Sequence, residues 1–174
     1  KKCIIIMSTE KKNEKVQQWK QQVRETFKKA FFNLLEQKVS SVPPDYEWLT
    51  RLYAEIKEKL MALLKKDSDV RNEINESMDT ELFMQMISND AFSISDFYKL
   101  ITYVFAKCVQ LQAPFRDEKT NEKLLEIIEH INSGDAVFST IVPLFIKNAN
   151  YCIDNIYEDM ENIKKNIQKN ITHQ

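Results

Sequence analysis

The 174-residue chain holds a single glycine, Gly134, and this scarcity limits its fold more than any other feature of the sequence. Tight hairpin turns use backbone angles that glycine adopts without strain, and a β-rich protein needs such a turn roughly every 8 to 12 residues. The four prolines do not replace the missing glycines. We therefore expect an all-α protein, built as a single bundle of about six or seven helices.

Apolar residues make up 43% of the chain, enough for one continuous core. We expect a single helical domain over residues 1–174, with its core at about 16–160 and with both ends frayed. The first helix should run from about Thr9 to Gln37. Its apolar residues recur every three or four positions, which predicts a core-facing stripe. The stripe comprises Trp19, Val23, Phe27, Ala30, Phe31, Leu34 and Leu35.

Acidic residues and serines mark where the later helices should begin. The expected caps are Asp45, Asp67, Asp79, Ser93 or Ser95, and Asp117. The helix that opens at Ser93 or Ser95 is apolar around much of its circumference, so it is the best candidate for the centre of the bundle. The helix after Asp117 should stop at Asn132-Ser133-Gly134. The last should begin near Asp135 and continue to about Asn170, kinked or interrupted by Pro143.

Charge and apolar content exclude several classes of partner. Lysine and arginine number 25 against 26 acidic residues, so no global field draws the chain to nucleic acid or to an acidic membrane, and any such contact would be local. Lys28 and Lys29 lie beside aromatic residues, and we interpret them as flanking a buried aromatic stripe rather than binding nucleic acid. No apolar run approaches the ~20 residues of a membrane span. The three scattered cysteines, Cys3, Cys108 and Cys152, favour buried thiols in a reducing cytoplasm over disulfides.

The sequence carries no recognisable catalytic, metal-binding or cofactor-binding group. The acids lie mostly on polar helix faces, and the only histidines are His130 and His173. Glu126 and His130 are four apart, but a carboxylate-bridged metal site in a bundle needs a second such pair. One glycine also leaves no glycine-rich phosphate loop. We expect no catalytic residue, metal or cofactor, and so no enzyme.

Four charged residues at helix joints differ from the rest because they lie beside apolar residues: Arg71, Asp79, Arg116 and Asp117. Arginine forms bidentate pairs that lock such joints, so these residues are either an internal clamp or an exposed site for a partner, and we favour the clamp. Candidate contacts with a protein partner lie in the terminal helices, at Trp19, Ile163 and Ile167.

A series of short motifs gives the chain a family resemblance. They are Pro43-Pro44-Asp45-Tyr46, Glu55-Ile56-Lys57-Glu58 with Leu63-Leu64, Arg71-Asn72-Glu73-Ile74 with Met78-Asp79, then Asn89, Ala91, Ile94-Ser95, Ala113-Pro114-Phe115-Arg116-Asp117-Glu118, and Ala149-Asn150-Tyr151. In this order and spacing, from about Val23 to Tyr151, the chain resembles the T-complex protein 11 family. It departs from the family at Gln112, where relatives usually have cysteine, at Asp90, where glycine is common, and at Pro143. It also stops where the family normally continues through more helices.

The resemblance implies a non-enzymatic, all-helical regulatory protein that binds a protein partner. Family members are linked to intracellular signalling around cyclic AMP and its protein kinase. A second hypothesis is a small viral helical modulator of host death or immune signalling that binds a partner helix in a groove. The abundance of lysine, asparagine and isoleucine would suit an AT-rich genome, such as that of a large virus or a protist.

Overall fold

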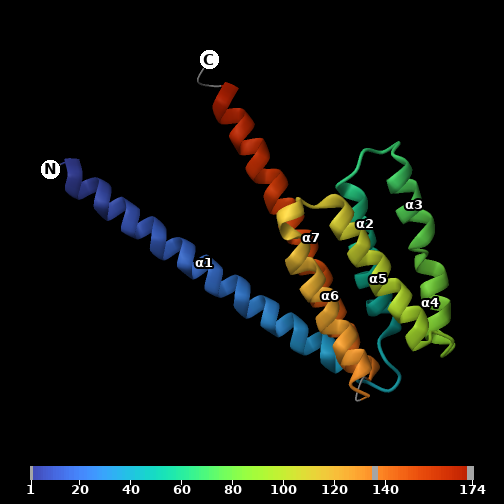
Figure 1. Cartoon of the computed structure of the whole chain (residues 1–174). Coiled ribbons are helices and arrows are strands. Elements are labelled where there is room, and N and C mark those ends of the chain that lie inside the picture. The colour runs from blue at the N-terminus through green and yellow to red at the C-terminus, as the bar shows by residue number, and fades with distance from the viewer. Residues whose placement is uncertain (1, 135–136, 172–174) are drawn as a thin grey trace. The chain divides into compact units, whose positions relative to one another are not determined.

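A computed structural model describes the backbone of residues 2–134 and 137–171. Side chains are described for residues 14–134 and 137–169. The described residues form seven α-helices and one short 3-10 helix, and no strand occurs among them (Figure 1). The elements are α1 (Lys2–Val39), α2 (Tyr46–Ala62), α3 (Asp69–Ser77), α4 (Thr80–Ser88), α5 (Ile94–Leu111), η1 (Pro114–Arg116), α6 (Asp117–Asn132) and α7 (Phe138–Ile171). The predicted all-α class is confirmed.

The chain divides into two compact units, residues 1–38 and residues 39–174. The first unit is the long helix α1, which begins at Lys2 rather than near Thr9. The expectation that its apolar stripe faces a core is wrong for most of the stripe: Trp19 is 64% exposed, Phe27 73% and Leu34 47%, and of the seven stripe residues only Leu35 is buried. A lone helix has no second element in its own unit against which to pack. One domain over residues 1–174 stays a prediction.

Side-chain caps set the starts of three helices in the second unit, as predicted. Asp45 Oδ1 accepts a hydrogen bond from the Trp48 amide at 3.0 Å and opens α2. Asp79 Oδ1 accepts from the first-turn amides of α4, each at 2.9 Å. Ser93 opens α5 in a reciprocal capping box with Asp96.

The predicted cap of α3 is wrong by one residue. Ser68, not Asp67, has the extended backbone of an N-cap, and its Oγ accepts from the Arg71 amide at 3.3 Å. Either side chain suits this role, so the choice depends on where the preceding turn leaves the backbone.

Two helices end in left-handed residues. Gly134 has a φ of 81° just after α6, at the predicted stop. Asp90 has a φ of 52° after α4, and the next amide, of Ala91, donates to the Met86 carbonyl at 2.8 Å in a Schellman arrangement. Aspartate tolerates this conformation better than most residues, which explains how it occupies a position where the resembled family commonly has glycine.

Helix α7 runs without interruption from Phe138 to Ile171, so the interruption expected at Pro143 is absent. The expected start at Asp135 lies outside the described residues. Pro143 falls in the second turn, where its missing amide removes one hydrogen bond close to the helix end. Buried neighbours on both sides offset that cost: Ile141, Val142, Phe145 and Ile146.

The core of the second unit is shared between α5 and α7. Helix α5 buries Phe97, Ile101, Val104, Phe105 and Cys108, as expected of a central helix. Helix α7 packs against α2, α5 and α6 and is equally central (Figure 1). Cys108 and Cys152 are free and buried, and burial raises the pKa of both thiols. The side chain of Cys3 lies outside the described residues.

Burial predicts opposite outcomes for two large side chains. Trp19→Ala should change the free energy of unfolding by no more than about 0.5 kcal/mol, because the indole is exposed. Phe105→Ala should cost about 3 to 5 kcal/mol, because the ring is 1% exposed and its removal leaves a cavity. Urea unfolding followed by circular dichroism measures both, and a large loss for Trp19→Ala would contradict this assignment.

Candidate functional site

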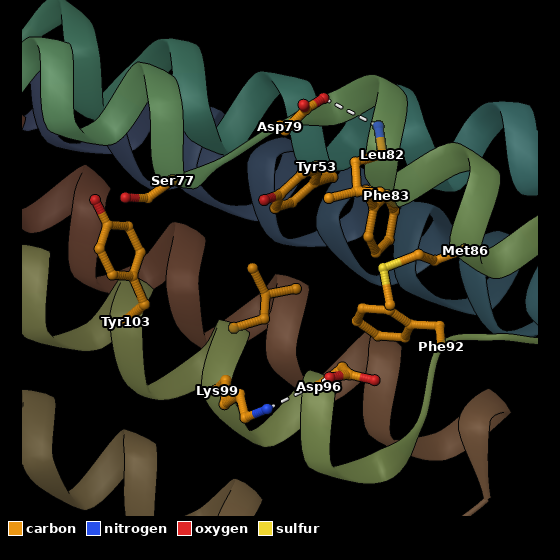
Figure 2. Close-up of a pocket in the computed structure, with 11 residues that line it drawn as sticks. Tyr53, Ser77, Asp79, Leu82, Phe83, Met86, Phe92, Asp96, Lys99 and Tyr103 are labelled. Carbon is orange, nitrogen blue, oxygen red and sulfur yellow. Dashed lines mark hydrogen bonds and ion pairs between the residues drawn. The ribbon is translucent and has the colours of Figure 1, made fainter.

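A groove of about 430 Å³ opens in the second unit between α4 and α5 (Figure 2). Its lining residues come from α2, the α3–α4 joint, α4, the α4–α5 loop and α5. They are Tyr53, Ser77, Asp79, Leu82, Phe83, Met86, Phe92, Asp96, Lys99, Leu100 and Tyr103. Helix α4 packs against α2, while α5 packs against α6 and α7, so the two walls rest on different neighbours.

A chain of aromatic contacts connects the groove to the core. Tyr53 packs on Phe83 with ring centroids 4.4 Å apart, and Phe83 meets Phe92 edge-on at 5.3 Å. Phe92 lies 6.2 Å from Phe97, which lies 5.6 Å from Phe145 on α7. The last three pairs are edge-to-face and the first is tilted. Aromatic pairs each add about 0.5 to 1.5 kcal/mol beyond their buried area. The groove wall is therefore continuous with the packed interior.

The groove is apolar along its length and charged at its rim. Tyr53 is buried, Phe83, Met86 and Phe92 are half-buried, and Figure 2 shows all four pointing into the same hollow. Leu82 at the rim is 52% exposed. The lining includes two carboxylates, Asp79 and Asp96, and one cation, Lys99, whose Nζ lies 3.6 Å from Asp96 Oδ1. The rim therefore carries an excess of negative charge.

Three ionisable groups of the groove, Tyr53, Tyr103 and Asp96, have shifted pKa values. Burial, with a smaller effect from the Asp79 charge, raises the pKa of Tyr53 well above its usual value. Burial also raises the pKa of Tyr103, against an opposing hydrogen bond with Ser77. Hydrogen bonds from Ser93 lower the pKa of Asp96. The phenols stay neutral and the carboxylate stays charged, an arrangement that suits binding better than proton transfer.

Arg116, at the joint between α5 and α6, forms a bidentate ion pair with α7. Its Nε donates to Asp159 Oδ2 at 3.0 Å, and its Nη2 donates to Asp159 Oδ1 at 2.7 Å. The two side chains are only 23% and 18% exposed. The hydrogen bonds from the guanidinium lower the pKa of Asp159, although partial burial opposes this. This geometry supports the clamp interpretation of Arg116.

Asp117 does not cap α6, which corrects the sequence prediction. Helix α6 continues directly from η1, so the residue in the N-cap position, Arg116, is already helical and makes no side-chain cap. Asp117 Oδ1 instead accepts from Gln112 Nε2 at 2.8 Å, and Thr120 Oγ1 donates to Gln112 Oε1 at 2.7 Å. Gln112 therefore bridges the joint at the position where the resembled family usually has cysteine.

The other two charged residues serve other joints. Arg71 Nη1 donates to the Met61 carbonyl near the end of α2, and Asp79 caps α4. Of the four candidates only Asp79 lines the groove, so the structure does not gather them into one binding site. A role for Arg71, Asp79, Arg116 or Asp117 in contacting a partner stays a prediction.

The candidate contacts in the terminal helices are accessible. Trp19 is 64% exposed, Ile163 59% and Ile167 53%, and their contact with a partner stays a prediction. His130 Nε2 lies 2.8 Å from Thr140 Oγ1 and so connects α6 to α7, while His173 lies outside the described residues. Within residues 2–134 and 137–171 no cluster of three metal-ligating side chains forms, and no helix is long and apolar enough to cross a bilayer.

Sequence reasoning missed the groove itself. In the sequence Leu82, Phe83, Met86 and Ile87 recur at helical spacing, which is typical of any helix that packs on a neighbour and does not by itself indicate a groove. At about 100° of rotation per residue these four span about 140° of a nine-residue helix, and Ile87 is buried while Leu82 is 52% exposed. Together with Phe92 in the following loop, that spread was the available signal of an open apolar face.

Comparison with known proteins gives one family. The family model described as T-complex protein 11 matches residues 7–156, a range that includes every groove residue. The chain is 29% identical to T-complex protein 11 of Mus musculus over 143 residues, which are 82% of this chain and 25% of that protein. It is 30% identical to T-complex protein 11 homolog of Homo sapiens over 140 residues, 80% of this chain and 27% of that protein.

The chain thus spans about a quarter of the length of these curated relatives. It is also 36% identical over 90 residues to T-complex protein 11-like X-linked protein 1 of Homo sapiens, which are 51% of this chain and 17% of that protein. No solved structure matches the chain.

The Arg116–Asp159 pair should contribute measurably to stability. Arg116→Ala should lower the free energy of unfolding by about 1 to 3 kcal/mol, because it leaves a partly buried carboxylate without its partner. The matched control is Lys165→Ala, which breaks the exposed Lys165–Glu161 pair and should cost no more than about 0.5 kcal/mol. Equal losses in urea unfolding would contradict the clamp.

The Arg116–Asp159 pair should also make the stability of the protein depend on pH. The folded-state pKa of Asp159 lies below its ordinary 3.8, so its stabilisation is present above pH 3.8 and is lost as the pH falls through the folded pKa. The difference in the free energy of unfolding between the wild type and Asp159→Asn should be largest and constant at about pH 5 to 7, and it should shrink below about pH 4. Urea titrations across this range measure it, and a constant difference down to pH 2 would refute the assignment.

Proposed function

This chain belongs to the T-complex protein 11 family, and we propose that it is a non-enzymatic, helical protein-interaction module that acts in cytoplasmic signalling. Its α4–α5 groove receives an amphipathic helix from a partner protein. The observation that carries this proposal is a formed, apolar hollow of about 430 Å³ whose wall is continuous with the core. A pre-formed groove binds a helix without first having to order its own side chains.

The chemistry of the groove describes its ligand. The aromatic and aliphatic lining calls for apolar side chains spaced three, four and seven residues apart on the ligand helix. The acidic rim, with Asp79 and Asp96 against Lys99, calls for a lysine or arginine beside that apolar face. The lining includes neither histidine nor cysteine, and its phenols stay neutral, which favours recognition over catalysis.

The resemblance to the family supports a partner in signalling by cyclic AMP and its protein kinase. The groove also suits the second hypothesis, a viral helical modulator of death or immune signalling, because that role needs a helix-binding groove of this kind. The two proposals share one site and differ in the helix that fills it, so direct binding separates them.

Binding should depend on Leu82 in the groove. Leu82→Glu places a carboxylate on the apolar rim and should weaken binding of the partner at least about tenfold. The matched control is Leu125→Glu on α6, because Leu125 has the same 52% exposure and does not line the groove. Both variants should fold like the wild type by circular dichroism, since both leucines are half in solvent.

The probes are purified regulatory and catalytic subunits of cyclic-AMP-dependent protein kinase and, separately, fluorescent helical peptides from death-signalling proteins. Isothermal calorimetry and fluorescence anisotropy measure their affinities. Leu82-dependent binding of a kinase subunit supports the first proposal, and Leu82-dependent binding of a death-signalling peptide supports the second. Binding that Leu82→Glu and Leu125→Glu weaken equally would refute the groove as the site.

A further inference from the structure

We propose that α1 is a peripheral membrane-binding helix that lies in the interface of an anionic phospholipid bilayer. The proposal rests on α1 alone and is independent of the α4–α5 groove. Six apolar residues form what we call the α1 stripe: Val16, Trp19, Val23, Phe27, Ala30 and Leu34. At about 100° of rotation per residue, they lie within an arc of about 80° along roughly 27 Å of helix.

Five of the six residues of the α1 stripe are exposed, and Val23 is half-buried. Trp19 is 64% exposed and Phe27 73%, and Val16 and Leu34 are 43% and 47% exposed. Two large aromatic side chains and two aliphatic ones therefore project from one face of a continuous helix. Tryptophan and phenylalanine on such a face are typical of helices that insert their apolar side into the headgroup boundary of a bilayer.

Charges are sorted around the α1 stripe. Lys20 and Arg24 flank one edge of it and Lys15 flanks the other, and all three are exposed. Lys28 and Lys29 are also exposed, but they lie farther round the helix, beside the acidic residues. The acidic residues of this segment lie on the opposite side of the helix, within about 40° of one another: Glu14, Glu25 and Glu36. Cations that border an apolar face reach lipid phosphates while their stems lie along the acyl boundary.

The two units also differ in the sign of their net charge. Residues 1–38 carry ten basic and four acidic residues, whereas residues 39–174 carry fifteen basic and 22 acidic residues. The net charge of the whole chain is therefore near zero although residues 1–38 are strongly positive. A field of this sign attracts α1 to an anionic surface, an effect that acts within about one Debye length.

The flanking charges favour a lipid surface over a second copy of the same helix. Helix pairs of the coiled-coil kind place acids against bases at the edges of the apolar seam. Both edges of the α1 stripe carry bases, so two such stripes face to face would bring like charges together. An anionic bilayer satisfies both the apolar face and the two basic edges.

The test is co-sedimentation of the full 174-residue chain with vesicles of pure phosphatidylcholine and with vesicles that contain about one-third phosphatidylserine. The wild type should bind the anionic vesicles, bind neutral ones much less, and lose binding when salt is raised to about 1 M, where the Debye length is about 3 Å. Phe27→Glu should lower binding at least about tenfold, because it removes one aromatic anchor from the bilayer.

The matched control is Gln21→Glu, which adds the same charge on the side of α1 opposite the stripe and should leave binding within about twofold of the wild type. In a Trp48→Phe background Trp19 is the only tryptophan, and its emission should shift to the blue on anionic vesicles. Helical content by circular dichroism confirms that each variant is folded.

Three outcomes would overturn the proposal. They are no binding of the wild type to anionic vesicles, equal binding to neutral vesicles, and equal losses in Phe27→Glu and Gln21→Glu. Self-association without lipid that Phe27→Glu abolishes would also overturn it and assign the stripe to a second copy. None of these results bears on Leu82-dependent helix binding, so failure here is distinguishable from failure of the groove proposal.

Discussion

The chain of rings from Tyr53 to Phe145 is the contact on which the rest of the second unit depends. It joins α2, α4, the α4–α5 loop, α5 and α7 through four ring pairs. Because α4 is only nine residues long, it has little helical stability of its own and is held by this packing. The same rings form both the interior and the wall of the groove, so the shape of the groove follows from the packing of the core.

The polar contacts around η1 act at a joint between helices. The Arg116–Asp159 pair ties η1 to α7, and Gln112 bridges Asp117 and Thr120 across the start of α6. Such contacts orient helices more than they add net stability, because desolvation offsets much of the attraction of a partly buried pair. Asp79 differs from the others because its carboxylate both caps α4 and lines the groove.

Local chemistry made the fold class and the starts of three helices predictable from sequence. Asp45, Asp79 and Ser93 cap the helices they precede, since a cap depends only on the next three residues. Asp117 was predicted as a cap and is not one, because a 3-10 turn leads straight into α6 and leaves no extended residue there. The open face of α4 and the exposure of Trp19 depend on which elements are available to cover an apolar surface. Periodicity marks such a surface but does not show what covers it.

An apolar stripe at helical spacing therefore does not by itself show whether it is buried in a core or exposed. The charged residues beside the stripe help to distinguish the two cases. On α5 the predicted stripe is buried, and on α1 a stripe of similar spacing is exposed. What distinguishes α1 in the sequence is the placement of its charges: Lys15, Lys20 and Arg24 flank the stripe, and no acid of residues 14–36 does. A helix that packs into its own protein core needs no such sorting, because its polar face meets only water. Sorted charges beside an apolar face point to an external surface of opposite sign, and that pattern is readable from the sequence alone.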